Sequence, residues 1–142
     1  MEEGVSFTQI DLDSGERFQA LRRELGVSTF GLNLVLLQPG QRGRIHRHEH
    51  QEEVYLVLDG ELSLSIEGEE HVLGQGALAR VAPNVRRQLV NRRAQRVVLL
   101  ALGGATDHTG RDGVAYVDWD DATGASPQEI PLPDDVAVEP AA

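Results

Sequence analysis

Two histidines and a glutamate stand close together in the sequence and have the side chains of a metal site. His46 and His48 are two positions apart on a segment expected to be extended, so both imidazoles project to the same face. Glu53 opens the next strand, and antiparallel pairing across the connecting turn can bring its carboxylate next to the histidines. Together they can supply three ligands to Fe, Mn, Ni, Zn or Cu and leave positions open for substrate. A bare His-x-His pair, however, is more often simply exposed.

The spacing of the surrounding residues distinguishes a metal site from a pair of exposed histidines. Five residues lie between Gly40 and His46, one between His46 and His48, four between His48 and Glu53, and six between Glu53 and Gly60. This pattern resembles the first signature motif of the cupin superfamily without a break. The resemblance implies an all-β fold, a double-stranded β-helix or jelly-roll-like barrel, with a divalent transition metal held by the two histidines and the glutamate. Both glycines are expected in turns with positive φ.

A second stretch, from Gly76 to Asn91, resembles the second cupin motif, and the whole resemblance covers about Leu32 to Leu102. The family pattern places a histidine, its fourth metal ligand, where this chain has Arg87. A guanidinium stays charged and cannot donate a lone pair to a metal, so three protein ligands remain. Asn84 replaces a glycine of the motif, which is a mild change because asparagine tolerates the left-handed region.

Arg87 leaves two outcomes open. In the first, a metal binds to the three ligands, and Arg87 turns aside or clamps an anionic substrate at the open face of the metal. In the second, Arg87 forms a bidentate ion pair with Glu53 and fills the site, which leaves a metal-free pocket. An inward cation beside a divalent ion is electrostatically unfavourable, whereas the presence of all three first-motif ligand types favours bound metal.

Two classes of function correspond to these outcomes. One is a metal-dependent enzyme of the oxygenase or isomerase type, in which Tyr55 forms a wall of the pocket or donates a proton. The other is a non-catalytic protein that binds a small anionic molecule in the same pocket through Arg87. His50 could add a ligand, but it lies in the turn, a position that the family usually leaves outside the site. The fold cannot choose between these classes, because one fold hosts many functions.

The elements that must position these residues are mostly short strands. Apolar runs bounded by Gly, Pro and Asn predict strands over residues 30–37, 53–58, 61–67, 72–73, 78–82, 87–90 and 96–102. Asp59-Gly60 predicts a tight hairpin between the second and third of them. Val97–Leu102 has no polar face, which predicts burial on both sides. One side would face the barrel interior and the other a second sheet layer or the partner subunit of a homodimer.

The remaining chain flanks this barrel. A short helix is expected before it, with Phe18, Leu21 and Leu25 at helical spacing, Ser14 as the cap and Gly26 at the end. The predicted organisation is an N-terminal extension over 1–29, the barrel over 30–104, a segment packed on the barrel over 105–122, and a tail over 123–142. The tail is acidic, contains four prolines and is expected to be extended or partly disordered.

The composition limits which binding partners and which cellular location we expect for the protein. The formal charge of −10 argues against nucleic acid, because phosphate binding needs a basic surface. No apolar run could cross a membrane and the amino terminus lacks the features of a signal peptide, so we expect a cytoplasmic protein. The chain has neither cysteine nor lysine, which excludes thiolate and Schiff-base chemistry. Six arginines between Arg80 and Arg96 either attract an anionic ligand or pair with surface acids.

Overall fold

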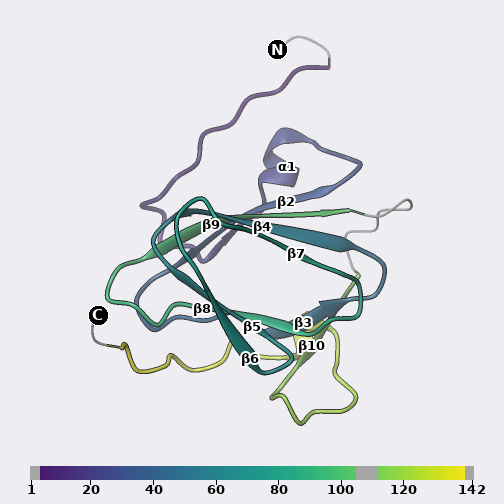
Figure 1. The fold of residues 1–142 in the computed structure, drawn as a ribbon. Coiled ribbons are helices and arrows are strands. Elements are labelled where there is room, and N and C mark those ends of the chain that lie inside the picture. Colours follow the sequence, from purple (N-terminus) through teal and green to yellow (C-terminus); the bar gives the residue numbers. More distant parts are fainter. Residues whose placement is uncertain (1–3, 105–111, 140–142) are drawn as a thin grey trace.

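Two five-stranded antiparallel sheets face each other in the computed structural model, which describes residues 4–104 and 112–139 (Figure 1). The first sheet has the order β1 (Phe18–Gln19), β2 (Gly31–Leu37), β9 (Val97–Gly104), β4 (Glu52–Asp59) and β7 (Leu78–Val81). The second sheet has the order β10 (Gly113–Tyr116), β3 (Ile45–His48), β8 (Arg87–Val90), β5 (Leu62–Ile66) and β6 (Glu69–Leu73). Among the described residues, the helical segments are α1 (Leu21–Leu25) and the 3-10 turn η1 (Pro127–Glu129). The all-β prediction is confirmed, and each predicted strand is present with its ends shifted by no more than three residues.

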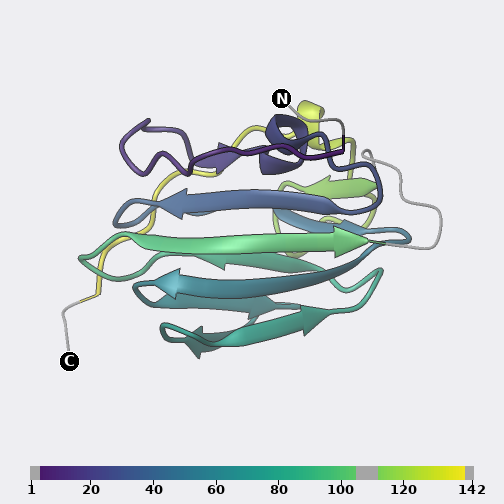
Figure 2. The same cartoon turned by 90° about the horizontal axis from the view of Figure 1, so that it is seen from above.

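The core lies between the sheets and is made by alternate residues of the strands. On β9, Val97, Leu99 and Ala101 point inward and join the main apolar cluster. Val98 points outward and is covered by Leu21 of α1 in a second, smaller cluster. Burial of this strand on both faces is therefore confirmed, but its outer face packs against α1 and not against another sheet layer. Figure 2 shows α1 beside the end of β2 at which that strand begins.

The predicted helix is present but shorter than expected. It begins after Ala20 and ends at Gly26, whose φ of 75° is the left-handed conformation that terminates helices. Phe18 lies in β1 instead and pairs with Val35 of β2. Ser14 does not cap the helix; its hydroxyl accepts a hydrogen bond from the backbone of Glu16.

The predicted hairpin at Asp59-Gly60 is wrong. The dipeptide connects β4 to β5, and these two strands lie in different sheets, so the connection turns a corner between the sheets. Gly60 does adopt the expected positive φ, 83°, and so does Gly40. A Cβ atom on Gly60 would lie 2.4 Å from the carbonyl oxygen of Arg96, so this corner leaves no space for a side chain.

The segment after residue 111 joins the second sheet. β10 pairs with β3 and places Ala115 opposite His46, an edge strand that the sequence did not indicate. The chain then runs back along the barrel as an extended segment (yellow in Figure 1). Arg42 donates to the carbonyl of Asp134, and the backbone N–H of Val136 donates to Gly40. No helix among the described residues is long and apolar enough to span a membrane.

The corner at Gly60 generates a first prediction. Gly60→Ala should lower the free energy of unfolding by about 3 kcal/mol, because it adds a backbone clash to an unfavourable positive φ. Gly68→Ala is the matched control: its φ is 86° but nothing lies within 4 Å of the added Cβ, so it should cost about 1 kcal/mol. Urea denaturation measures both, and equal losses would contradict this account of the corner.

Candidate metal centre

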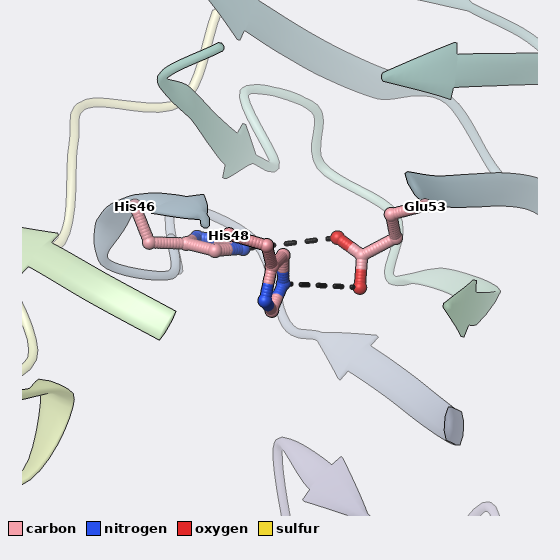
Figure 3. Close-up of side chains that lie close together, drawn as sticks. All are labelled: His46, His48 and Glu53. Atoms are coloured by element: carbon pink, nitrogen blue, oxygen red, sulfur yellow. Dashed lines mark ion pairs between the residues drawn. The ribbon is translucent and has the colours of Figure 1, made fainter. Parts of the chain in front are cut away.

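The two sheets bring His46, His48 and Glu53 together at one end of the barrel. His46 and His48 lie on β3 of the second sheet, and Glu53 lies on β4 of the first. The Nε2 atom of His46 is 3.8 Å from Oε1 of Glu53, and Nε2 of His48 is 3.5 Å from Oε2 (Figure 3). The predicted convergence is therefore present, but its predicted route is wrong. β3 and β4 do not pair across their turn; they face each other across the barrel interior.

The inward-facing side chains of β4 become polar, and those of β9 become smaller, toward the site. On β4 the inward residues pass from Glu53 through the buried Tyr55 to Val57 in the apolar core. On β9 the inward residues shrink toward the site, from Leu99 through Ala101 to Gly103. A Cβ on Gly103 would lie 2.9 Å from the side-chain oxygen of Gln51 and 3.7 Å from Oε2 of Glu53. This end of the barrel is therefore left open for a polar site while the other end is filled.

Arg87 and Tyr55 hold the Glu53 carboxylate from the core side. Oε1 of Glu53 accepts a hydrogen bond from the Tyr55 hydroxyl and forms an ion pair with Nη2 of Arg87 at 3.2 Å. Nε of Arg87 donates to the Tyr55 oxygen at 3.1 Å, and Nη1 donates to the carbonyl of Val85 at 2.7 Å. Because the Tyr55 hydroxyl and Nη2 of Arg87 both engage Oε1, Oε2 of Glu53 is left toward His48.

The position of Arg87 agrees in part with the second outcome considered for it. The ion pair with Glu53 forms, but through one nitrogen, so it is not bidentate. The guanidinium is fully buried, and neither Arg87 nor Tyr55 lines either of the two cavities that border the site. Both side chains lie behind Glu53 on the core side, and their role as pocket residues stays a prediction. Asn84 adopts the left-handed φ expected of it, 68°, and its N–H donates to the carbonyl of His48.

The ionisation states of Glu53 and Tyr55 follow from their surroundings. Burial alone would raise the pKa of Glu53, but the hydrogen bonds and charges of His46 and His48 outweigh it and hold that pKa well below its usual value. Burial, together with the Glu53 carboxylate, raises the pKa of Tyr55 well above its usual value. Tyr55 therefore stays protonated and donates to an ionised Glu53.

The free nitrogens of the two histidines fit a cation. Nδ1 of His46 lies 3.1 Å from the carbonyl of Arg44, which can only accept, so the proton is assigned to Nδ1. In the neutral ring, Nε2 then presents its lone pair toward the Glu53 carboxylate, an arrangement that a proton or a metal ion between them stabilises. Nδ1 of His48 is buried without a partner among the described residues, and the ring faces Glu53 through Nε2. The three ligand atoms lie within 4.8 Å of one another.

Two small cavities border these ligands. One of about 220 Å³ reaches His48 and Glu53 from the side of α1 and is lined by Arg22 and Arg23. The other, of about 190 Å³, reaches His46 and His48 from the side of β10 and is mostly apolar, with Phe18 on its wall. The site is therefore accessible to small molecules from two directions.

The comparison with protein families rests on the same stretch of chain. The family description "Cupin domain" matches residues 33–103, which is half of the chain and contains both motifs and all three candidate ligands. This chain belongs to the cupin family. The double-stranded β-helix fold expected from the motifs is thereby confirmed, as is the all-β architecture with its one short helix.

Solved structures of other cupins resemble this one. A sugar phosphate isomerase of the cupin superfamily from Silicibacter pomeroyi is 28% identical, with a TM-score of 0.61, and the match covers 89% of this chain and 97% of that one. A cupin protein from Bacteroides fragilis is 21% identical, with a TM-score of 0.65, over 81% and 99% of the two chains. A sugar phosphate isomerase candidate from Acidithiobacillus ferrooxidans is 23% identical, with a TM-score of 0.58, over 63% of this chain and 59% of that one, so this cupin spans less than two thirds of its length. No curated protein matches the sequence.

Other residues singled out by the sequence lie elsewhere in the cupin. His50 is mostly exposed and bonds Asp112 through Nδ1 at 2.8 Å, outside the group of three ligands. Most arginines between Arg80 and Arg96 pair with surface acids, as one of the two interpretations held; Arg87 is the buried exception. Sequence reasoning missed Arg22 and Arg23, because nothing in a five-residue helix indicates that it lies at the mouth of a barrel.

The buried ion pair generates a second prediction. Arg87→Met should lower the free energy of unfolding of the metal-free cupin by about 3 kcal/mol, because Glu53 then stays buried without its cation. Arg80→Met is the matched control, since Arg80 pairs with Glu52 on the exposed surface and its loss should cost less than about 1 kcal/mol. Guanidinium denaturation measures both variants. A loss as small for Arg87→Met as for Arg80→Met would mean that Arg87 does not stabilise the Glu53 carboxylate.

Proposed function

We propose that this cupin binds one divalent transition metal through His46, His48 and Glu53, and that the metal site acts on or binds a small molecule. The observation that carries the proposal is the convergence of two imidazole nitrogens and one carboxylate, all within 4.8 Å of one another. Two imidazoles and a carboxylate suit Fe, Mn, Ni, Zn or Cu, and three protein ligands leave coordination positions open.

The residues of this chain have separate roles around such a metal. When bound, the metal would supply Lewis-acid or redox chemistry to an oxygen-containing ligand. His46 is oriented by the carbonyl of Arg44, and Glu53 is oriented by Tyr55 and Arg87, which occupy Oε1 and leave Oε2 toward His48. Partners of this kind fix the direction of metal ligands and thereby their affinity. Arg87 then acts on the metal through Glu53 and not as a ligand.

An isomerase of small sugar phosphates is the enzyme class to test first. The S. pomeroyi protein that is 28% identical to this cupin over 89% of the chain carries that description. The cavities of about 220 and 190 Å³ beside the ligands are small, which favours a small substrate over a macromolecule. A metal-dependent oxygenase uses the same three ligands and is the alternative within the enzyme class. The cytoplasmic location and the homodimer stay predictions.

One observation favours a second candidate, a metal-free cupin that binds a small anion. The ion pair between Arg87 and Glu53 is formed and fully buried on the arginine side, so the carboxylate already has a cation at 3.2 Å. A divalent ion would add a second and stronger positive charge close to that guanidinium. The two candidates differ in a single measurable property, the metal content of the native protein.

Metal content provides the third prediction. The full-length protein, purified without an affinity tag and analysed by plasma mass spectrometry, should carry or take up about one transition metal ion per chain. His48→Ala and Glu53→Gln should each reduce uptake at least about tenfold, because each removes a ligand. His71→Ala, an exposed histidine on β6, is the control and should leave uptake unchanged. Native protein that takes up less than about a tenth of an equivalent would exclude the metal-dependent function.

Replacing the arginine with the family histidine gives the fourth prediction. Arg87 lies opposite His46 in the pairing of β8 with β3, so Arg87→His puts an imidazole beside the existing ligands and removes the neighbouring cation. This variant should bind metal at least about tenfold more tightly than the native protein, as measured by competition with a chelating dye. Arg87→Met removes the charge without adding a ligand, and should bind less tightly than Arg87→His. Loss of metal binding in a folded Arg87→His protein would show that the guanidinium supports the site.

A further inference from the structure

Two arginines of α1 border the cavity that leads to the metal ligands. Arg22 and Arg23 line it on one side, and His48 and Glu53 line it on the other. The helix is held there because Leu21 packs into the cluster on the outer face of β9 and β2. A single cavity of about 220 Å³ therefore has two positive side chains and two of the proposed metal ligands on its walls.

These two arginines differ from every other arginine that the structure describes. The others each donate to a carboxylate, a carbonyl or a polar side chain, for instance Arg93 to Glu61 and Arg44 to Ile130. Within residues 4–104 and 112–139, no ion pair or side-chain hydrogen bond of Arg22 or Arg23 is formed. Nε of Arg22 is in addition buried, and a buried N–H of a charged group is costly to leave without an acceptor.

The helix itself does not account for this arrangement. Arginines in the last turn of a helix interact favourably with its carbonyl end, and both residues lie in the last turn of α1. That interaction explains arginines on the solvent side of a helix, where water satisfies the guanidinium. It does not account for an arginine that lines a cavity and whose Nε is buried without an acceptor. A ligand in the cavity would supply acceptors to those parts of the two arginines that line it.

The charges that line this cavity favour an anion. Glu53 is the only acid among its lining residues, and its carboxylate is already engaged by Arg87 and Tyr55. Neither Arg22 nor Arg23 forms a salt bridge to it, so both guanidiniums stay available to a ligand. Guanidinium groups bind phosphate oxygens through paired N–H donors, and two of them match the charge of a phosphate monoester better than that of a carboxylate.

We propose that Arg22 and Arg23 form the phosphate subsite of a small phosphorylated ligand, whose other end reaches His48 and Glu53. The inference rests on the proposed function for the part of the ligand at the metal, whereas the subsite itself depends on the two arginines alone. It gives α1 a role in substrate selection: compounds without the phosphate group lose the contacts with both guanidiniums. The apolar cavity on the side of β10 has no such cation among its lining residues and would take uncharged groups.

The test is isothermal titration calorimetry of the full-length protein with inorganic phosphate and, in parallel, with acetate at the same ionic strength. The variants are Arg22→Gln with Arg23→Gln, and the control is Arg92→Gln, which removes one arginine paired with Glu70 on the second sheet. The double variant should weaken phosphate binding at least about tenfold, because both donors are lost. The control should change it by less than about twofold, and acetate should bind more weakly than phosphate.

The same titration of Glu53→Gln separates this inference from the metal-dependent function. Phosphate binding that persists in Glu53→Gln and is lost in the double variant supports the subsite, whatever the metal content of the protein. Phosphate binding that is lost in Glu53→Gln but unchanged in the double variant means that phosphate binds the metal, and overturns the subsite while leaving the metal site intact. Absence of phosphate binding to the native protein, or acetate binding as tight as phosphate, also overturns the proposal.

Discussion

The site depends on how a carboxylate buried between two sheets is neutralised. Glu53 is 7% exposed, and removing a carboxylate from water to that extent is unfavourable without compensating charge and hydrogen bonds. The compensation comes from opposite directions, from Arg87 and Tyr55 on the core side and from the two histidines on the open side. Arg87, Tyr55 and His46 all lie against Oε1, whereas Oε2 is directed toward His48, and these contacts together fix the orientation of the carboxylate.

This division explains how the cupin motif can tolerate an arginine in place of its fourth ligand. The guanidinium does not enter the space between His46, His48 and Glu53, because its three nitrogens are taken up by Glu53, Tyr55 and the carbonyl of Val85. It stabilises the ionised carboxylate, as the outer partners of metal ligands do. Its charge, however, would repel a divalent ion, so in the proposed metal site the same residue would orient one ligand and lower the electrostatic attraction for the metal.

Apolar side chains fill one end of the barrel and leave the other end, beside Glu53, open. The helix α1 lies at this open end. Inward residues of β9 shrink from Leu99 to Gly103 toward the ligands, so the apolar core ends before Glu53 and a polar cavity begins. α1 serves two purposes at this end. Leu21 covers the outer face of β9, and the arginines that follow it reach the mouth of the cavity. A short helix that completes the core thus also carries the charges that would select a ligand.

The sequence alone determined most of the barrel strands, the candidate ligands and the family, because these depend on local features: side-chain alternation, glycines with positive φ, and the spacing of His46, His48 and Glu53. It also placed an arginine in the fourth ligand position. The sequence could not show which strands share a sheet, so the hairpin at Asp59-Gly60 was wrong and the histidines meet Glu53 across the barrel instead of across a turn. Nor could it show that Arg87 is buried behind Glu53, or that Arg22 and Arg23 line the cavity beside it. These placements arise from the packing of segments distant in the sequence, and only the tertiary structure decides them.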